Sequence, residues 1–222
     1  MSRSYLVLGS ISTLAFLIIG ALIFTSVTQV ADAQLAVAIN HSYLGSAITT
    51  VMVLSAEYGR EYFWIPVVGF MLLFGNQRTK LLAIELGALF IVGIAVGEVM
   101  KLAVFRPRPF ESLDTIITRV PTDLDSSFPS GHALIVSIGA AFSVLKFKRK
   151  IVGLLFVLEA AIVCYSRVYV GIHYPLDVIA GIFLGIGIGG VGLFVVERYL
   201  GALISKITSL TTSKLKDGPL DL

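Results

Sequence analysis

Six apolar runs constrain the fold of this 222-residue chain more than any other feature of its sequence. A helix needs about 20 apolar residues to cross the hydrocarbon core of a bilayer, and the longer runs reach that length. We therefore predict an all-α integral membrane protein, in which one domain over residues 1–222 forms a bundle of six transmembrane helices. The expected spans lie at roughly 5–27, 62–75, 80–105, 131–147, 151–170 and 176–199.

The composition agrees with a membrane protein and excludes other classes. Hydrophobic residues make up 56% of the chain and charged residues 14%, whereas soluble domains carry about 25% charged residues. A net charge of +3, with no basic block among aromatic residues, does not suit nucleic-acid binding. Cys164 is the single cysteine, so no intrachain disulfide can form.

The first run raises a choice between a cleaved signal peptide and a retained helix. VADAQ at 30–34 resembles a cleavage site, but the apolar stretch at 5–27 exceeds the roughly 7–15 residues of a signal sequence. We expect a retained first helix. The moderately apolar segment Ser46–Tyr58 either lies in the interface or extends the helix that follows it. The long polar connections are expected at 28–45 and 106–130.

Charges at the ends of the runs predict the orientation of the chain. NQRTK at 76–80 and KFKRK at 146–150 lie, with Arg3 and Arg198, at ends that alternate spans bring to one face. Cytoplasmic loops of membrane proteins are rich in Lys and Arg, so this face should be cytoplasmic. We expect a multi-pass plasma-membrane protein whose 106–130 connection lies outside the cell.

The last run contains a stripe of small residues. GIFLGIGIGG places Gly181, Gly185 and Gly189 on one face of a helix. Small residues at this spacing let two helix backbones approach closely, either within a bundle or at a dimer seam. We favour packing within the bundle, and the expected function does not require an oligomer.

FPSGHALIV, residues 128–136, starts a span with residues that suit an anion. Ser130 after Pro129 is a favourable N-cap, which predicts a helix from Gly131 or His132 onward. The free N–H groups of a first helical turn attract phosphate, and Gly131 lets it approach the backbone. His132 can give or take a proton beside that anion. An ordinary capped helix remains the alternative for this stretch.

SRVYVGIHYPLD, residues 166–177, joins two spans. Pro175 suits the first position of the last helix, which puts His173 just before that helix and Asp177 in its first turn. A carboxylate within reach of an imidazole can fix its tautomer, so that a neutral His173 can act as a nucleophile. Arg167 faces the same side. The alternatives are a structural His–Asp hydrogen bond and an arginine that extends to the headgroups.

KLAVFRPRP, from Lys101 onward, ends the third run with three cations. Guanidinium groups, here Arg106 and Arg108, bind phosphate oxygens in pairs, and lysine adds a point charge. Taken alone, these side chains read as cations that extend to the headgroups. All three stretches, however, fall at span ends on the expected outer face. Together they predict a site that holds a phosphate while a histidine attacks it.

At these residues the chain resembles the type 2 phosphatidic acid phosphatase superfamily of membrane lipid phosphatases. The family signature has three parts, K-x6-R-P, P-S-G-H and S-R-x5-H-x3-D, and each spacing is matched here. Arg106 and Arg119 lie outside the signature, so the resemblance implies no role for them. The matching residues are Lys101, Arg108, Pro109, Pro129, Ser130, Gly131, His132, Ser166, Arg167, His173 and Asp177.

The resemblance implies a role for each polar group of the signature. His173 would be the nucleophile that forms a phosphohistidine, and Asp177 would orient it. His132 would protonate the leaving oxygen and later activate water. The family needs no cofactor or metal, and Asp123 with Asp125 offers too few ligands for a convincing cation site. The residues expected to bind the phosphoryl group are Lys101, Arg108, Ser130, Gly131 and Arg167.

The expected function is hydrolysis of a lipid phosphate monoester or diphosphate at the extracytoplasmic membrane surface. Candidate substrates are a polyprenyl diphosphate, phosphatidylglycerol phosphate and phosphatidate. One rival function is a phosphatase for soluble phosphate esters, and another is a non-catalytic membrane protein that binds anionic lipid. The pairing of His173 with Asp177 argues against the second rival, because binding alone does not require it.

Overall fold

The computed structural model describes residues 2–122 and 124–200, and most of these residues are helical. The expected all-α class is confirmed. The helices are α1 (Ser2–Leu22), α2 (Ser26–Asn40), α3 (Ser46–Tyr58), α4 (Glu61–Phe74), α5 (Gln77–Ala103), α6 (Pro109–Ser112), α7 (Gly131–Lys146), α8 (Lys150–Tyr169), α9 (Pro175–Val195) and a π-helical turn at Val196–Leu200.

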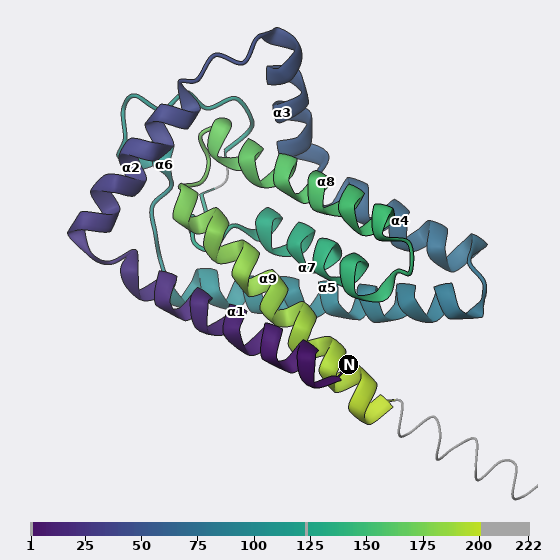
Figure 1. Cartoon of the computed structure of the whole chain (residues 1–222). Coiled ribbons are helices and arrows are strands. Elements are labelled where there is room, and N and C mark those ends of the chain that lie inside the picture. The colour runs from purple at the N-terminus through teal and green to yellow at the C-terminus, as the bar shows by residue number, and fades with distance from the viewer. Residues whose placement is uncertain (1, 123, 201–222) are drawn as a thin grey trace, which may run out of the picture.

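Helix α7 lies in the middle of the bundle. Figure 1 shows α5, α8 and α9 around it, and all three contact it. Every side chain from Ala133 to Ala140 is buried, as expected for a helix that is apolar on all sides. The core of the bundle therefore fixes the position of the first turn of α7, which carries Gly131 and His132.

Glycines let α9 pack closely between α7 and α1 (Figure 1). A Cβ at Gly181 would lie 2.6 Å from the carbonyl oxygen of Ser130, and one at Gly185 would overlap the carbonyl of Leu134. On another face, a Cβ at Gly190 would lie 2.7 Å from a carbonyl oxygen of α1. The expected packing of Gly181 and Gly185 within the chain is confirmed, and it brings the starts of α7 and α9 together.

The first expected span ends early. α1 stops at Leu22 and does not continue to Val27, and α2 begins at Ser26. The hydroxyl of Thr25 donates to the Leu22 carbonyl oxygen (3.0 Å). The Gln29 side chain donates to the Ile23 carbonyl oxygen (3.0 Å). Polar side chains thus satisfy carbonyls that a continuous helix would have paired with its own backbone.

The expected polar connection at 28–45 is largely helical, because residues 28–40 belong to α2 and only 41–45 are irregular. Asp32, Ala36 and Asn40 of α2 are buried at four-residue spacing. Ser46–Tyr58 is a separate helix, α3, which ends at Gly59. Figure 1 shows α2 and α3 at the same end of the bundle as the connection between α8 and α9.

The helices of the bundle differ in length. α4 and α7, which cover two of the six expected spans, have 14 and 16 residues, less than the about 20 needed to cross a bilayer without adjustment. The count of six spans therefore stays a prediction. Within the described residues, the segments long and apolar enough to cross a membrane are Arg3–Leu22, Gln77–Ala103, Lys150–Tyr169 and Pro175–Tyr199.

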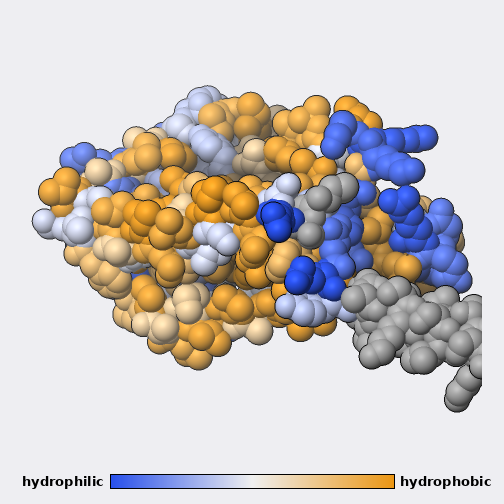
Figure 2. Space-filling model, turned by 60° about the horizontal axis from the view of Figure 1, so that its bottom comes forward, coloured by the Kyte–Doolittle hydropathy of each residue, from blue (hydrophilic) through white to orange (hydrophobic). Residues whose placement is uncertain are grey.

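The outer surface of the bundle is apolar. Figure 2 shows hydrophobic side chains over much of the visible face, with hydrophilic side chains gathered mainly toward its ends. A continuous exposed apolar surface of this kind marks contact with lipid. The chain is an integral membrane protein. Exposed hydrophobic side chains on α1, α5 and α8 include Ile11, Leu14, Leu17, Ile84, Ile91, Ile151 and Leu155.

Candidate active site

The three motifs meet in one polar pocket of about 430 Å³ at the end of the bundle where α5 and α8 finish and α7 and α9 begin. Six of the eight predicted site residues line it, and Ser130 and Asp177 lie behind its wall. The lining also includes four residues to which the sequence assigned no role in the site. The complete lining is Arg60, Glu98, Lys101, Arg108, Leu124, Asp125, Gly131, His132, Arg167 and His173.

Ser130 starts α7 as the sequence predicts. Its hydroxyl accepts from the Ala133 N–H (3.5 Å), and the helix begins at Gly131. The backbone N–H of Ser130 donates to the carbonyl oxygen of Asp177 (3.0 Å), which ties the start of α7 to the start of α9. The free N–H groups of the first turn of α7 therefore lie beside the pocket, where a phosphate is attracted.

His173 is held with one ring nitrogen available to a substrate. The residue is 2% exposed, and its Nδ1 lies 2.8 Å from the carbonyl oxygen of Ser127. A carbonyl oxygen only accepts hydrogen bonds, so Nδ1 carries the proton and Nε2 carries the lone pair. The orientation of His173 thus comes from the backbone just before Phe128 and Pro129.

The electrostatic environment keeps His173 neutral. Burial lowers its pKa well below the usual range, and the charges of Arg167, Arg108 and Lys101 lower it further. The Ser127 hydrogen bond opposes this shift but does not reverse it. A neutral imidazole is the form of histidine that can act as a nucleophile.

Asp177 does not contact His173 in the expected way. Its Oδ2 lies 3.8 Å from Nδ1 of His173, which is too far for a hydrogen bond. The same oxygen accepts from the Ser127 hydroxyl (2.5 Å) and from the Tyr174 N–H (2.9 Å). The carboxylate of Asp177 therefore caps the first turn of α9 through the Tyr174 N–H. Ser127 lies between Asp177 and His173 and bonds to both.

Two motif cations share one carboxylate in the pocket. Lys101 and Arg108 both form an ion pair with Asp125, and Arg108, which is 2% exposed, also donates to the Ile172 carbonyl (3.1 Å). Burial alone would raise the pKa of Asp125, but hydrogen bonds from the two cations lower it to about 2. Asp125 is therefore engaged with cations of the protein, and Asp123 lies outside the described residues.

Arg167 and His132 complete the wall of the pocket. Arg167 is 5% exposed and donates to the Ala56 carbonyl at the end of α3 (2.5 Å). Nε2 of His132 is buried and has no hydrogen-bond partner among the residues that the structure describes. A polar atom in this state is available to an oxygen of a bound molecule.

An arginine outside the signature supports the site from behind. Arg106 binds Asp177 through Nη1 (2.5 Å) and Asp32 of α2 through Nη2 (2.7 Å). Its guanidinium also lies over the ring of Tyr174, 4.1 Å from the centroid. Asp32 in turn accepts from the Leu176 N–H (2.9 Å). The sequence signals for this network were weak: Arg106 occupies a variable position between Lys101 and Arg108, and Asp32 is an acid in the segment expected as a polar connection.

Comparison with known proteins places these residues in a family. A model of the PAP2 superfamily matches residues 82–199, a segment that contains all three motifs. The chain belongs to the PAP2 superfamily. The resemblance predicted from the motifs is confirmed, and the chain is a hydrolase of the PAP2 phosphatase type.

Two PAP2 relatives carry the name undecaprenyl-diphosphatase. One, from Sulfolobus acidocaldarius, is 44% identical over 147 residues, which cover 66% of this chain and 69% of that protein. The other, BcrC of Bacillus subtilis, is 30% identical over 186 residues, which cover 78% of this chain and 93% of that protein.

Two solved PAP2-type structures share the fold. A transmembrane PAP2-type phosphatidylglycerolphosphate phosphatase from Bacillus subtilis superposes with a TM-score of 0.70 at 24% identity, over 86% of this chain and 97% of that one. LpxE of Aquifex aeolicus gives a TM-score of 0.64 at 24% identity, over 72% of this chain and 93% of that one. At this identity the two structures establish the fold alone.

Proposed function

We propose that this membrane lipid phosphatase removes the terminal phosphate of a polyprenyl diphosphate through a phosphohistidine on His173. The observation that carries the proposal is a buried, neutral imidazole whose free Nε2 lies in a pocket with Lys101, Arg108 and Arg167. Phosphoryl transfer depends mainly on positioning and on cations that stabilise the developing charge, and this pocket provides both. The two undecaprenyl-diphosphatase relatives favour a polyprenyl diphosphate over other lipids.

The proposed reaction has two steps. In the first, Nε2 of His173 attacks the terminal phosphorus, the bond to the bridging oxygen breaks, and His132 gives that oxygen a proton as the lipid monophosphate leaves. In the second, water attacks the phosphohistidine while His132 takes a proton from the water. Inorganic phosphate leaves, and both histidines return to their initial states. Asp177 acts by positioning Ser127, because it accepts from the Ser127 hydroxyl, and the Ser127 backbone carbonyl in turn orients the imidazole of His173.

An apolar groove beside the pocket supports a lipid substrate. The groove has a volume of about 380 Å³ between α4 and α5, is lined by Trp64, Val68 and Phe90 among others, and shares Arg60 with the polar pocket. A tail in this groove would help to hold the phosphate in place, because remote apolar contacts contribute to positioning. Soluble phosphate esters make no such contact.

The test is an assay of the purified protein in detergent against a panel of phosphates, with excess EDTA present. The panel contains a long-chain polyprenyl diphosphate, its short-chain analogue, phosphatidylglycerol phosphate, phosphatidate and p-nitrophenyl phosphate. We expect the long-chain diphosphate to exceed the short-chain one in kcat/KM by at least about tenfold, which needs about 1.4 kcal/mol of differential binding. Equal rates for both chain lengths would favour a soluble-ester phosphatase, and no turnover of any compound would favour a lipid-binding protein.

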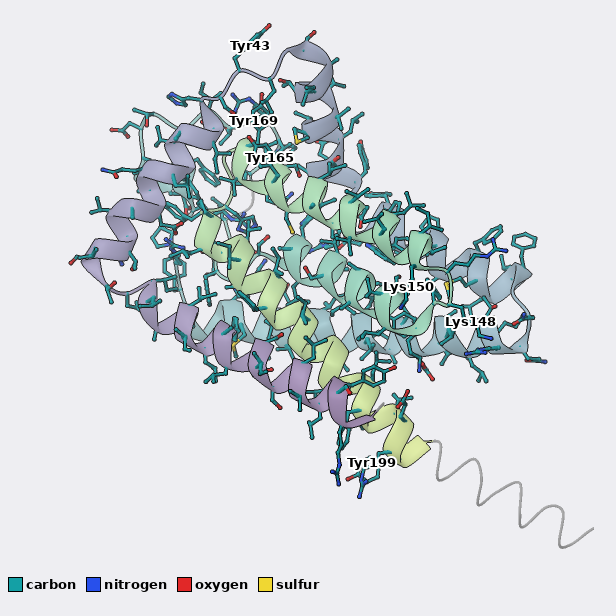
Figure 3. All side chains as sticks on the ribbon, in the orientation of Figure 1. Tyr43, Lys148, Lys150, Tyr165, Tyr169 and Tyr199 are labelled. Carbon is teal, nitrogen blue, oxygen red and sulfur yellow. The ribbon has the colours of Figure 1, made fainter. Side chains whose placement is uncertain are left out.

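The proposed topology has six spans, α1, α4, α5, α7, α8 and α9, with the pocket on the outer side of the plasma membrane. The short α7 is enclosed by other helices, so its length need not match the bilayer on its own. Six spans place the connection after α2 outside and the one before α8 inside. Figure 3 shows Tyr43 and Lys148 at these two opposite ends of the molecule.

Cysteine labelling tests this orientation. Tyr43 is 91% exposed and Lys148 is also exposed, so either position accepts a cysteine in a Cys164→Ser background. With an impermeant maleimide outside intact cells, we expect Tyr43→Cys to react and Lys148→Cys to react only after the cells are opened. The reverse pattern would place the pocket on the cytoplasmic side.

A further inference from the structure

Arg60 is the fourth cation of the pocket, and it belongs to none of the three motifs. It directly precedes α4, and its Nη1 lies 3.1 Å from the position that a Cβ on Gly131 would occupy. Its guanidinium therefore lies beside Gly131 at the start of α7, one residue before His132. Within the part of the chain that the structure describes, the Arg60 side chain forms an ion pair with Glu61 through Nη2.

Three adjoining cavities meet at Arg60. It lines the polar pocket of about 430 Å³, the apolar groove of about 380 Å³, and a narrow space of about 60 Å³ between them. Gly93, Gly97 and Gly131 also line the narrow space. Arg60 thus stands where the polar pocket changes into the apolar groove.

The order of groups along this path matches the order of groups in a lipid diphosphate. The phosphoryl group that is transferred must lie beside His173, and the oxygen that leaves must lie beside His132. The apolar tail lies in the groove between α4 and α5. The part of the substrate between the leaving oxygen and the tail then passes Arg60, and in a diphosphate that part is the second phosphate.

Arg60 also has donors to offer. Its Nε is buried and has no hydrogen-bond partner within the described part of the chain. Lys101, which lines the same narrow space, and Arg108 are both paired with Asp125. A guanidinium can bind phosphate oxygens through two N–H groups at once, so one arginine at this point suffices to hold a phosphate.

We infer that Arg60 binds the phosphate that stays on the lipid and thereby sets a preference for diphosphates over monophosphates. The inference rests on the proposed function, because it takes the roles of His173 and His132 from that mechanism. A lipid monophosphate has no charged group at this point of the path, so Arg60 contributes little to its turnover.

The test compares one polyprenyl chain as its diphosphate and as its monophosphate. We expect Arg60→Met, which keeps the apolar stem of the side chain, to lower kcat/KM for the diphosphate by about 10- to 100-fold, the scale of a lost hydrogen bond to a charged group. The monophosphate should change by no more than about threefold, because it places no charge beside Arg60. Arg60→Lys should keep part of the preference, since it keeps the charge but not the paired donors.

Two control variants separate the phosphate effect from other effects. Glu61→Gln removes the partner of Arg60 but leaves its guanidinium, so the preference for the diphosphate should persist or rise. Gly69→Leu adds an apolar side chain to the lining of the groove, at a position where nothing lies within 4 Å of the added Cβ. It should lower the turnover of both substrates alike, because both carry the same tail.

The outcomes distinguish this inference from the proposed function. Equal losses for both substrates in Arg60→Met, or in Arg60→Lys where the methionine variant does not fold, would overturn the role of Arg60. If the wild type hydrolyses phosphatidate but no diphosphate, the proposed substrate is wrong, and the role of Arg60 is withdrawn with it. Selective loss of diphosphate turnover supports both.

Discussion

Replacement of His173 by alanine is expected to abolish turnover in a protein that still folds. The change removes the buried imidazole whose Nε2 accepts the phosphoryl group, and the covalent route is then lost. Removal of a nucleophile that works as part of a unit lowers kcat by at least about 10⁴-fold. Release of inorganic phosphate from a polyprenyl diphosphate by the purified variant measures the loss.

His41 provides the matched control for this variant. Its ring contacts the Thr115 carbonyl (2.7 Å), and it does not line the pocket. His41→Ala should keep activity near that of the wild type, and thermal unfolding in detergent checks that both variants fold. Substantial phosphate release by folded His173→Ala would remove His173 from the role of nucleophile.

The second large effect is expected at His132. General acid catalysis contributes about 10²–10⁴-fold, so His132→Ala should lose roughly that factor with a natural, poor leaving group. With p-nitrophenyl phosphate the loss should be much smaller, because p-nitrophenolate leaves without a proton. The comparison holds when formation of the phosphoenzyme limits the rate, and the absence of a pre-steady-state burst of the leaving group shows that it does.

The dependence on the leaving group separates proton transfer from a structural role. His132 lies in the first turn of α7, where an alanine suits the helix, so the fold should tolerate the change. Equal losses with both leaving groups would mean that His132 only shapes the pocket. A loss confined to the poor leaving group would identify it as the proton donor.

The sequence predicted the parts of the site that local signals control. The Ser130 cap, the helix start at Gly131 and the proline that opens α9 each depend on a few adjacent residues. The spacing of charged residues at the ends of apolar runs was enough to bring six of the eight predicted residues into one pocket. The motif residues meet because each lies at the end of a helix, and helices packed side by side in a bundle bring those ends together.

The parts that were missed depend on tertiary contacts. The partner of His173 is a backbone carbonyl at Ser127, and any residue type can supply one. α2 is held by Asp32 and Asn40, whose partners lie more than 70 residues away along the chain. Arg60 had no motif around it, and the folded chain alone brings its guanidinium to Gly131 at the start of α7.

The buried charges of the Arg106 network explain why α2 is part of the site. Arg106 holds Asp32 and Asp177 together, so α2, which lies in the expected polar connection, supports the start of α9. A buried ion pair that loses one partner leaves an uncompensated charge, which is strongly destabilising. The network therefore fixes the carboxylate of Asp177, and through Ser127 the imidazole of His173.

The most direct test of the central claim is to trap the phosphoenzyme. The wild type is mixed with a polyprenyl diphosphate labelled in its terminal phosphate, quenched during turnover, and digested for peptide mapping. We expect an acid-labile, alkali-stable label on the peptide that contains His173, and no such label in His173→Ala. Label on another residue, or a burst of phosphate release with no labelled protein at any time, would contradict the account.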